Sequence, residues 1–535
     1  MTETVSKQAR NATEIDVFDP ATGELVGRVP VFDESKVKAA VNSAREAASL
    51  WSKTSFAERR RLVEKVCGIV TDEMDEIARL ISKETGKPVG EAISMEIAPV
   101  IDLMNHFARN AARSLRPRRI PIGLYTLLGR RSMIIYKPWG VVGIIPAWNY
   151  PFSIPLGEAA MALMAGNTVV IKPAESTSLT GVKIGEIFAK AGFPKHAVQI
   201  VTGAGETGAA LVAAPPDKIM FTGSVATGKR IAATAATNLT STVLELGGKD
   251  PMVVFADANL ALAAKAAVWG AFCNAGQSCS SVERLYVESS VAEKLTRLIV
   301  EETKKLKLGV GTDDDVSVGA MSSERQIQVV EDHVEDFRRS GAKIEIGGTR
   351  KPPEGGIPNL TPNLFYEPTV ISGATNEMLG MREETFGPTL PIATFATEDQ
   401  AIALANDSEF GLTASVWSRD KQKARRVAAK IDAGTVTINE VLYTHGIGQT
   451  PWGGFKNSGR GRTHGVEGLM ELVQMQHIHE NLLPILPDAW WMPYSANAVK
   501  TFRGFATKFA SGSFFRTVTL LPQLLKRIFE IRKSK

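Results

Sequence analysis

Short apolar runs alternate with helical stretches between residues 141 and 245, and this alternation constrains the fold more than any other feature of the sequence. The predicted strands are Val141–Ile145, Thr168–Ile171, Val198–Val201, Lys218–Phe221 and Thr242–Leu244. The predicted helices between them cover residues 153–165, 179–191, 206–213 and 226–236. Continuously apolar strands separated by helices indicate a parallel sheet that is covered on both faces. We therefore expect an α/β protein that binds its ligand at the carboxyl ends of the strands.

The rest of the chain adds a second α/β region and a helical N-terminal part. Apolar residues recur at helical spacing within residues 33–113. Two apolar runs flank Gly129 within residues 120–137 and predict a β-hairpin. The second α/β region begins near Pro251 and is predicted to contain a strand at Met252–Phe255, a helix at 259–271, a strand at Leu285–Val287 and a helix at 292–307.

Composition excludes several classes of protein. The chain has 535 residues and a formal charge of +5, which is too small to indicate a nucleic-acid partner. Its three cysteines, Cys67, Cys273 and Cys279, are too few and too scattered for a disulfide framework and favour a reducing cytoplasm. The polar N-terminus is no signal peptide, and no uncharged apolar run reaches the roughly 18 residues of a membrane span. No Cys/His cluster has zinc spacing, so no metal site is expected.

A glycine loop after the third predicted strand offers one phosphate site. Gly203, Gly205 and Gly208 have the G-x-G-x-x-G spacing of dinucleotide-binding loops. However, the acidic residue expected about 20 positions later is missing, because Asp217 comes too early. A pyrophosphate contact and a purely structural turn both remain open for this loop.

The segment at residues 221–230 offers a second candidate phosphate site. The strand runs into Gly223 and Ser224, and a helix begins near Val225. Gly223 permits close approach of a ligand to the backbone, and the first N–H groups of the helix, with Ser224, can hold phosphate oxygens. The alternative is an ordinary strand-to-helix turn capped by Ser224.

Two further residues suggest covalent chemistry. Cys279 lies among small polar residues just after a predicted helix, in contrast to a core cysteine, and a thiol is nucleophilic without extreme activation. Glu245 lies in a glycine-rich turn at a strand end, where a carboxylate can act as a general base. Sequence spacing alone does not bring the two together.

Seven segments, taken in order, make the chain resemble the aldehyde dehydrogenase superfamily over about residues 15–480. They are residues 147–151 (AWNYP), 172–175 (KPAE), 221–224 (FTGS), 245–249 (ELGGK), 276–279 (GQSC), 384–388 (ETFGP), and 453–456 with 458–459 (GGFK, SG). The resemblance is strongest to non-acylating, bacterial semialdehyde dehydrogenases. Ala147 and Trp452 depart from the residues common in the family, and neither departure removes a reacting group.

The resemblance implies a role for each matching position. Cys279 would be the nucleophile, Glu245 the general base that releases the acid from a thioester, and Asn149 the donor to the oxyanion. The cofactor would be NAD, with NADP as the alternative. Its implied contacts are Ile145, Trp148, Lys172, Glu175, Phe221, Gly223, Ser224, Thr227, Leu246, Glu384 and Phe386.

The resemblance also implies a domain plan. Residues 1–116 and 137–247 would form a Rossmann-like NAD-binding domain, and residues 248–470 an α/β catalytic domain. Residues 117–136 and 471–480 would form a small β arm that assembles a homodimer or homotetramer. The enzyme would be cytoplasmic.

Function is then expected to be oxidation of an aldehyde to a free acid. Acyl transfer to coenzyme A and a non-catalytic scaffold on the same fold are the alternatives, and the presence of Glu245, Cys279 and Asn149 opposes them. The loop Val441–Thr450 would line the substrate mouth. It carries Tyr443 but no arginine to bind a second carboxylate, so a semialdehyde acid is not specifically indicated.

The tail, residues 481–535, differs in composition from the rest. Its last 36 residues hold nine Lys and Arg against one acid, a charge of +8, so the other 499 residues carry 5 − 8 = −3. Aromatic and leucine-rich faces accompany this charge. The pattern fits a helix on an anionic membrane surface, and packing on the same or a neighbouring subunit is the alternative. A nucleic-acid partner is not expected.

Overall fold

The structure is a computed structural model that describes residues 13–357, 363–485, 487–513, 515 and 518–533. The chain divides into two compact units, which are described separately. Unit 1 comprises Met1–Ala112 and Pro138–Val473, and unit 2 comprises Arg113–Lys137 and Gln474–Lys535.

The first sheet of unit 1 has the strand order β17-β9-β8-β5-β6-β7. Its strands are β5 (Val141–Ile145), β6 (Thr168–Ile171), β7 (Val198–Ile200), β8 (Lys218–Thr222), β9 (Ser241–Glu245) and β17 (Gly459–Arg460). β5 to β9 pair in parallel, and β17 pairs antiparallel with β9. All five residues of β5 are buried, so helices cover both faces of the sheet, as the continuous apolar pattern predicted.

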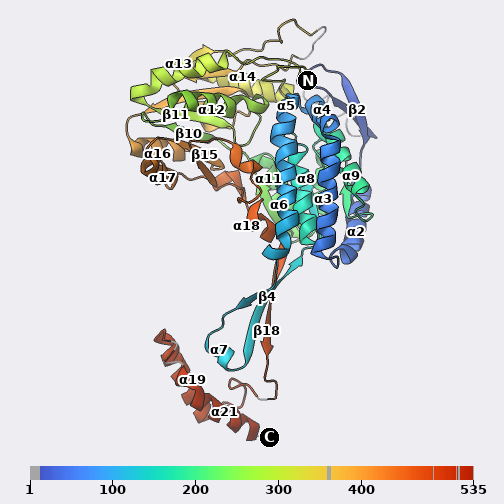
Figure 1. The fold of residues 1–535 in the computed structure, drawn as a ribbon, viewed down its shortest axis with the longest axis vertical. Helices are drawn as coiled ribbons and strands as arrows, with labels where there is room; N and C mark the ends of the chain where they lie inside the picture. The colour runs from blue at the N-terminus through green and yellow to red at the C-terminus, as the bar shows by residue number, and fades with distance from the viewer. Residues whose placement is uncertain (1–12, 358–362, 486, 514, 516–517, 534–535) are drawn as a thin grey trace. The chain divides into compact units, whose positions relative to one another are not determined.

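Helices from the N-terminal part and from the crossovers provide that cover. They are α2 (Glu34–Trp51), α3 (Phe56–Asp72), α4 (Met74–Thr85), α5 (Val89–Glu91), a π-helix (Ala92–Ile97), α6 (Ala98–Ser114), α8 (Ser153–Ala165), a 3-10 turn (Glu175–Thr177), α9 (Ser178–Ala191), α10 (Gly205–Ala213) and α11 (Val225–Thr237). One face buries apolar residues of α2, α10 and α11. α8 contacts β5 and β6, and α3 packs against α8 (Figure 1). An N-terminal hairpin, β1 (Glu14–Phe18) and β2 (Leu25–Pro30), completes this part.

The second sheet of unit 1 has the order β12-β13-β14-β11-β10-β15-β16. Its strands are β10 (Asp250–Val254), β11 (Val282–Glu288), β12 (Lys343–Ile346), β13 (Thr369–Ser372), β14 (Thr389–Phe395), β15 (Thr413–Trp417) and β16 (Thr435–Ile438). Its helices are α12 (Leu260–Phe272), α13 (Ala292–Thr303), α14 (Glu324–Arg339), α15 (Leu379–Arg382), α16 (Glu398–Asn406) and α17 (Lys421–Ala428), with α18 (Gly465–Glu471) near the end of the unit. Short 3-10 turns lie at Cys273–Gly276, Ser289–Val291, Tyr443–Gly446 and Lys456–Ser458.

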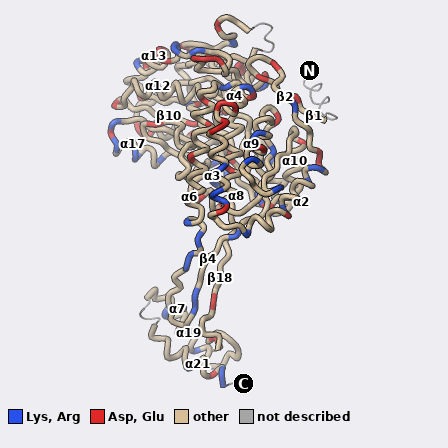
Figure 2. The backbone as a smooth tube through the Cα atoms, turned by 45° about the vertical axis from the view of Figure 1, so that its right-hand side comes forward, with Lys and Arg blue, Asp and Glu red and all other residues tan. Residues whose placement is uncertain are grey.

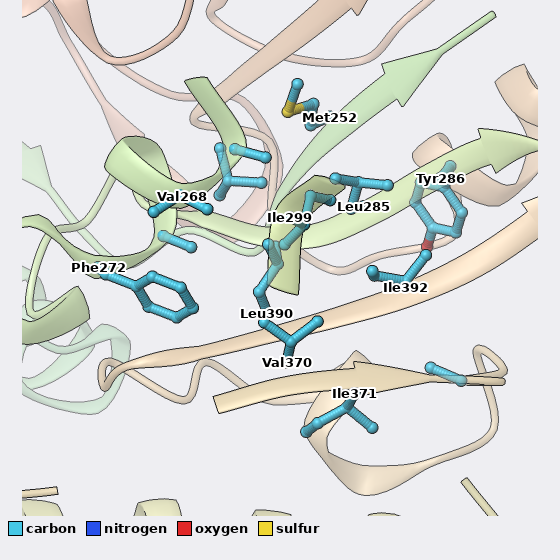
Figure 3. Packing of buried hydrophobic residues seen from close by; sticks show 14 of the residues in the cluster. Met252, Val268, Phe272, Leu285, Tyr286, Ile299, Val370, Ile371, Leu390 and Ile392 are labelled. Carbon is cyan, nitrogen blue, oxygen red and sulfur yellow. The ribbon is translucent and has the colours of Figure 1, made fainter. Parts of the chain in front are cut away.

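The core of this second region lies between the sheet and its helices. Leu285, Ile299, Val370 and Leu390 are fully buried, and they bring together β11, α13, β13 and β14 (Figure 3). α12 and α13 pack against each other beside this core (Figure 1). Such a packed platform holds the loops at its edge in fixed positions, which is what a catalytic site requires.

The described part of unit 2 contains a small sheet, one short helix and two longer helices. The sheet order is β18-β4-β3, with strands β3 (Arg118–Ile120), β4 (Arg130–Pro138) and β18 (Val473–Asn481). The predicted hairpin is present, but its first strand is wrong: residues 124–127 form the short helix α7 (Leu124–Leu127), and β3 supplies the strand instead. An apolar run of this length is compatible with either structure, so its pattern alone did not decide. Gly129 has φ 71°, as expected for the turn.

The tail of unit 2 forms two helices, α19 (Ala496–Ala510) and α21 (Leu521–Lys533). Phe505 and Leu524 are buried between them, and the ring of Trp490 stacks on Phe502 at 5.3 Å. Pro522 does not interrupt the second helix, because it occupies the first turn, where a missing N–H is tolerated. Lys and Arg recur along α21 and β4 (Figure 2). In the described part of the chain, no helix is both long and apolar enough to cross a membrane.

Candidate active site

Glu245 is the last residue of β9, at the carboxyl edge of the first sheet. In the register of the sheet it lies opposite Thr222 of β8, and Phe221 in turn lies opposite Ile145 of β5. The edge therefore gathers the ends of three strands that are far apart in sequence. This is the edge where parallel sheets bind their ligands.

Two glycines bring the loop of Cys279 to this edge. A Cβ on Gly248 would lie 2.3 Å from the carbonyl oxygen of Cys279, so the chain after β9 approaches the Cys279 backbone as only glycine allows. A Cβ on Gly276, which has φ 72°, would lie 2.1 Å from the carbonyl oxygen of Gly387. The tertiary fold thus joins Cys279 and Glu245, which sequence spacing could not do.

Asn149 holds the same loop from the other side. Its Nδ2 donates to the carbonyl of Gln277 at 2.9 Å, and its own carbonyl accepts from Asn274 Nδ2 at 3.2 Å. Asn274 and Ala275 have φ near 52°, in the left-handed region, which makes the turn before Cys279 tight. Within the described residues, the buried Oδ1 of Asn149 has no hydrogen-bond partner. The side-chain amide of Asn149 is therefore fixed against the backbone of the loop that carries Cys279.

A buried ion pair also holds the backbone of Asn149 in place. Lys87 Nζ bonds Glu96 Oε1 at 2.7 Å and donates to the carbonyl of Asn149 at 2.6 Å, and both charged side chains are fully buried. Glu96 Oε2 accepts the backbone N–H groups of Phe152 and Ser153, where α8 begins. The pair therefore fixes the turn that carries Asn149.

The protein environment keeps the thiol protonated in this state. Burial raises the pKa of Cys279, and the carboxylates of Asp250, Glu384 and Glu245 raise it further. A partly buried thiol beside carboxylates is a weak nucleophile while it is protonated, so its activation needs a base or a change in charge nearby.

Glu245 is also harder to ionise than an ordinary glutamate. Burial raises the pKa of Glu245 well above its usual range; Glu158 raises it further and Arg462 lowers it. In the described part of the chain, neither carboxylate oxygen of Glu245 has a hydrogen-bond partner. A raised pKa makes the ionised form of this carboxyl a stronger base, so Glu245 can act as a general base once it has lost its own proton.

Two cavities meet at Cys279. A cavity of about 470 Å³ is lined by Cys279, Tyr150 and residues of the loop Val441–Thr450, including Tyr443. A smaller cavity of about 30 Å³ is lined by Cys279, Glu245 and Glu158. The thiol therefore faces a space large enough for a small molecule on one side and a water-sized space with the carboxyl on the other.

Comparison with known proteins decides the family. Residues 6–478 match the model of the aldehyde dehydrogenase family. The chain is 39% identical to 4,4'-diapolycopene aldehyde oxidase of Methylomonas sp, over 92% of this chain and 91% of that protein. It is 38% identical to a protein of Mycobacterium tuberculosis named as a succinate-semialdehyde dehydrogenase [NADP(+)], over 85% and 86%.

Solved structures agree. An NAD-dependent aldehyde dehydrogenase from Sinorhizobium meliloti superposes with a TM-score of 0.84 at 38% identity, over 90% of this chain and 94% of that one. A betaine aldehyde dehydrogenase from Staphylococcus aureus, in complex with NAD+, superposes with a TM-score of 0.83 at 35% identity, over 91% and 97%.

The chain belongs to the aldehyde dehydrogenase family. The predicted family and α/β fold are thereby confirmed, as is the predicted class of reaction, the NAD(P)-dependent oxidation of an aldehyde.

The nicotinamide-side residues predicted for this aldehyde dehydrogenase lie close together. Glu384 Oε1 accepts the N–H of Gly248 at 2.9 Å, and a Cβ on Gly247 would lie 2.4 Å from Glu384 Oε2. Trp148 and Phe386 pack edge to face with ring centroids 5.5 Å apart. Burial raises the pKa of Glu384 to about 8. The Glu384 carboxyl, beside two glycines near Cys279, could accept a ribose hydroxyl, and the two aromatic side chains could pack beside a nicotinamide ring.

The adenosine-side residues fit a dinucleotide as well. Lys172 is almost fully buried, and its Nζ lies 3.4 Å from a carboxylate oxygen of the exposed Glu175, both at the end of β6. Ser224 caps α11 by accepting the N–H of Thr227 at 3.3 Å, and its side chain is exposed. A helix start with an exposed hydroxyl suits a pyrophosphate.

The remaining predicted contacts pack around this helix start. A Cβ on Gly223 would lie 2.6 Å from the ring of Phe221, and Leu246 fills the space beside Gly228. Ile145 is buried at the end of β5. Gly203, by contrast, has a packing reason of its own, because a Cβ there would lie 1.9 Å from Thr207 Oγ1. This close packing explains the glycine at 203 without a phosphate ligand and favours a structural turn at residues 203–208.

Three residues of the site escaped the sequence argument. Glu158 is a buried carboxyl whose pKa burial raises to about 8, and it is the single acid in the apolar helix α8, a signal that was available. Lys87 and Glu96 gave no signal, because a Lys and a Glu nine residues apart are ordinary on a helical surface. Only burial reveals them.

Proposed function

We propose that this enzyme oxidises its aldehyde to the free acid through a covalent intermediate on Cys279. The thiol proton leaves to water, the Cys279 sulfur adds to the aldehyde carbon, the C=O electron pair moves to the oxygen, and the Asn149 amide with the Cys279 N–H stabilises that oxyanion. The bound nicotinamide supplies the hydride acceptor. A thioester then remains on Cys279. The observation that carries this proposal is that Cys279 and Glu245 face one small cavity while Asn149 holds the loop of the thiol.

Glu245 completes the cycle. Its carboxylate takes a proton from water, the hydroxide adds to the thioester, and the C–S bond breaks to release the acid and the Cys279 thiol. Because the pKa of Glu245 is raised, its basic form gains population as the pH rises. The test is reduced-cofactor absorbance with short aldehydes, with and without coenzyme A. Turnover that depends on coenzyme A would favour acyl transfer, and no turnover with intact cofactor binding would favour a scaffold.

The cofactor preferred is NAD. Glu175, next to the buried Lys172, would accept hydrogen bonds from the adenosine ribose hydroxyls, and a 2′-phosphate there would meet a like charge. Ser224, Gly223 and the first turn of α11 would hold the pyrophosphate.

The arm of unit 2 assembles a homodimer or homotetramer. β18 is an edge strand, and its residues from Gln474 to Glu480 are exposed, with Met475 66% and Ile478 39% accessible. An exposed edge with apolar side chains is a template for pairing with another chain. The mass of the native protein by light scattering, compared with that of a Met475→Asp/Ile478→Asp variant, tests this: loss of assembly in the variant supports the arm, and an unchanged mass refutes it.

The tail binds the inner face of an anionic membrane, which places this cytoplasmic enzyme at its surface. Trp491, Met492, Phe515 and Phe529 are between 54% and 83% exposed, beyond the small core that α19 and α21 already bury. Exposed aromatic residues beside clustered Lys and Arg match an interfacial anchor.

Sedimentation with vesicles tests the anchor. The full chain should sediment with anionic vesicles and be released by salt, and a Trp491→Ala/Phe529→Ala variant should remain largely in the supernatant. Leu239→Ala, at an apolar residue of unit 1 that is 91% exposed, is the matched control and should sediment as the full chain does. If the full chain stays in the supernatant, the tail serves packing alone.

A further inference from the structure

The side of Cys279 that a substrate approaches is aliphatic and aromatic. The cavity of about 470 Å³ carries Met95, Ala98, Pro99, Ile154 and Leu442 on its walls, together with rings of Tyr150, Trp269 and Tyr443. Trp269 and Tyr443 are 43% and 63% exposed, so the apolar surface continues outward to solvent. A substrate body longer than the cavity itself can therefore keep apolar contact.

The formal charge that lines this cavity is negative. Asp102, on α6, is the charged residue of the lining, and no Lys or Arg is among the described residues that line it. His445 adds no positive charge at neutral pH, because burial lowers its pKa to about 4. The smaller cavity behind the thiol adds two more carboxyl groups, Glu158 and Glu245. A second carboxylate on the aldehyde would lose hydrating water in this cavity and find no Lys or Arg among its described lining residues. It would also meet the exposed carboxylate of Asp102.

The same cavity would also bind an aldehyde with an ammonium group weakly. Recognition of a quaternary ammonium uses several open aromatic faces. Tyr150 donates its hydroxyl to Ser278, next to the thiol, at 3.3 Å, and its ring already holds the Nζ of Lys87 at 4.2 Å from the centroid. A second cation against that ring would be repelled by the first. The rings of Trp269 and Tyr443 are 43% and 63% exposed, so each is partly turned to solvent.

We infer that the aldehyde oxidised at Cys279 is neutral and carries an extended apolar body, and that Asp102 excludes aldehydes bearing a second carboxylate. This rests on the proposed function. The inferred substrate differs from succinate semialdehyde, after which the mycobacterial relatives are named, although this chain is 38% identical to those relatives.

The experiment compares kcat/KM for four aldehydes: octanal, propanal, succinate semialdehyde and betaine aldehyde. We expect octanal to exceed succinate semialdehyde and betaine aldehyde by at least about 100-fold, and to exceed propanal because of its longer apolar body. Either charged aldehyde matching octanal would overturn the inference. Propanal reports on the proposed chemistry alone. Inactivity toward all four aldehydes would contradict the proposed function, whereas activity with a different order of kcat/KM values would contradict only the inferred substrate.

Substitution of Asp102 tests whether this residue excludes aldehydes that bear a second carboxylate. Asp102→Ser and Asp102→Arg should each raise the ratio of kcat/KM for succinate semialdehyde over octanal, the arginine variant by tenfold or more. Glu293→Arg, at an 87% exposed carboxylate of α13 outside this cavity, makes the same change in net charge and should leave the ratio within twofold. If Glu293→Arg shifts the ratio as much as Asp102→Arg does, or if neither Asp102 variant shifts it, Asp102 is not the excluding group.

Discussion

Lys87→Met should both destabilise the enzyme and slow it, although Lys87 touches no reacting atom. The side chains of Lys87 and Glu96 are fully buried, and Lys87 Nζ makes a 2.7 Å ion pair with Glu96 and a 2.6 Å hydrogen bond to the Asn149 carbonyl. Methionine has nearly the same length but leaves Glu96 Oε1 charged and unpaired. Breaking a buried pair in this way costs about 3–5 kcal/mol.

The effect on rate follows from Asn149. Its carbonyl loses its lysine donor, so its amide is held less firmly beside the Cys279 loop, and a loss of about 1.4 kcal/mol of transition-state stabilisation already lowers kcat tenfold. The double variant Lys87→Met/Glu96→Gln should recover part of the stability, because it removes the stranded charge as well.

Urea unfolding followed by tryptophan fluorescence, at one protein concentration for all variants, measures the stability. Lys190→Met is the matched control: its partner is Glu73, its side chain is half exposed, and its loss should cost less than about 1 kcal/mol. A Lys87→Met variant as stable as Lys190→Met, or a double variant less stable than Lys87→Met, would refute the reasoning.

Four further outcomes are expected. Cys279→Ser should lose turnover while titration of protein fluorescence still detects cofactor binding, because an alcohol is far less ionised than a thiol; near-normal turnover would remove Cys279 as the nucleophile. Glu245→Gln should give a burst of reduced cofactor in stopped flow followed by turnover slowed about 10²–10⁴-fold, and an equal fall in burst and turnover would argue against a deacylation base. Glu158→Gln should move the acidic limb of the pH–kcat profile to lower pH, since Glu245 acts when ionised and Glu158 helps to raise its pKa; an unmoved limb would mean that the two carboxyls are not coupled in the working enzyme. Steady-state kcat/KM should favour NAD over NADP, and Glu175→Ser should narrow that preference; a tenfold preference for NADP in the unmodified enzyme contradicts the assignment.

Much of the fold followed from local patterns. Parallel strands buried on both faces must be apolar throughout, and helices that cover them repeat apolar residues at helical spacing, so the strand at Val141–Ile145 and the helix at 153–165 were predicted with the bounds observed. Where one sequence pattern is compatible with both a helix and a strand, the prediction was wrong. The run at 124–127 became α7, because a short apolar segment does not choose between helix and strand until its neighbours are placed.

The sequence by itself determined which chemical groups are available: a thiol at Cys279, a carboxyl at Glu245 and an amide at Asn149, each within a motif of the family. The tertiary structure alone decided their state and their surroundings. Burial depends on atoms from distant parts of the chain, so the raised pKa values of Cys279 and Glu245 could not be read from either segment. The same holds for the Lys87–Glu96 pair, because its energy comes from the exclusion of water, and water is excluded only when the whole fold closes around it.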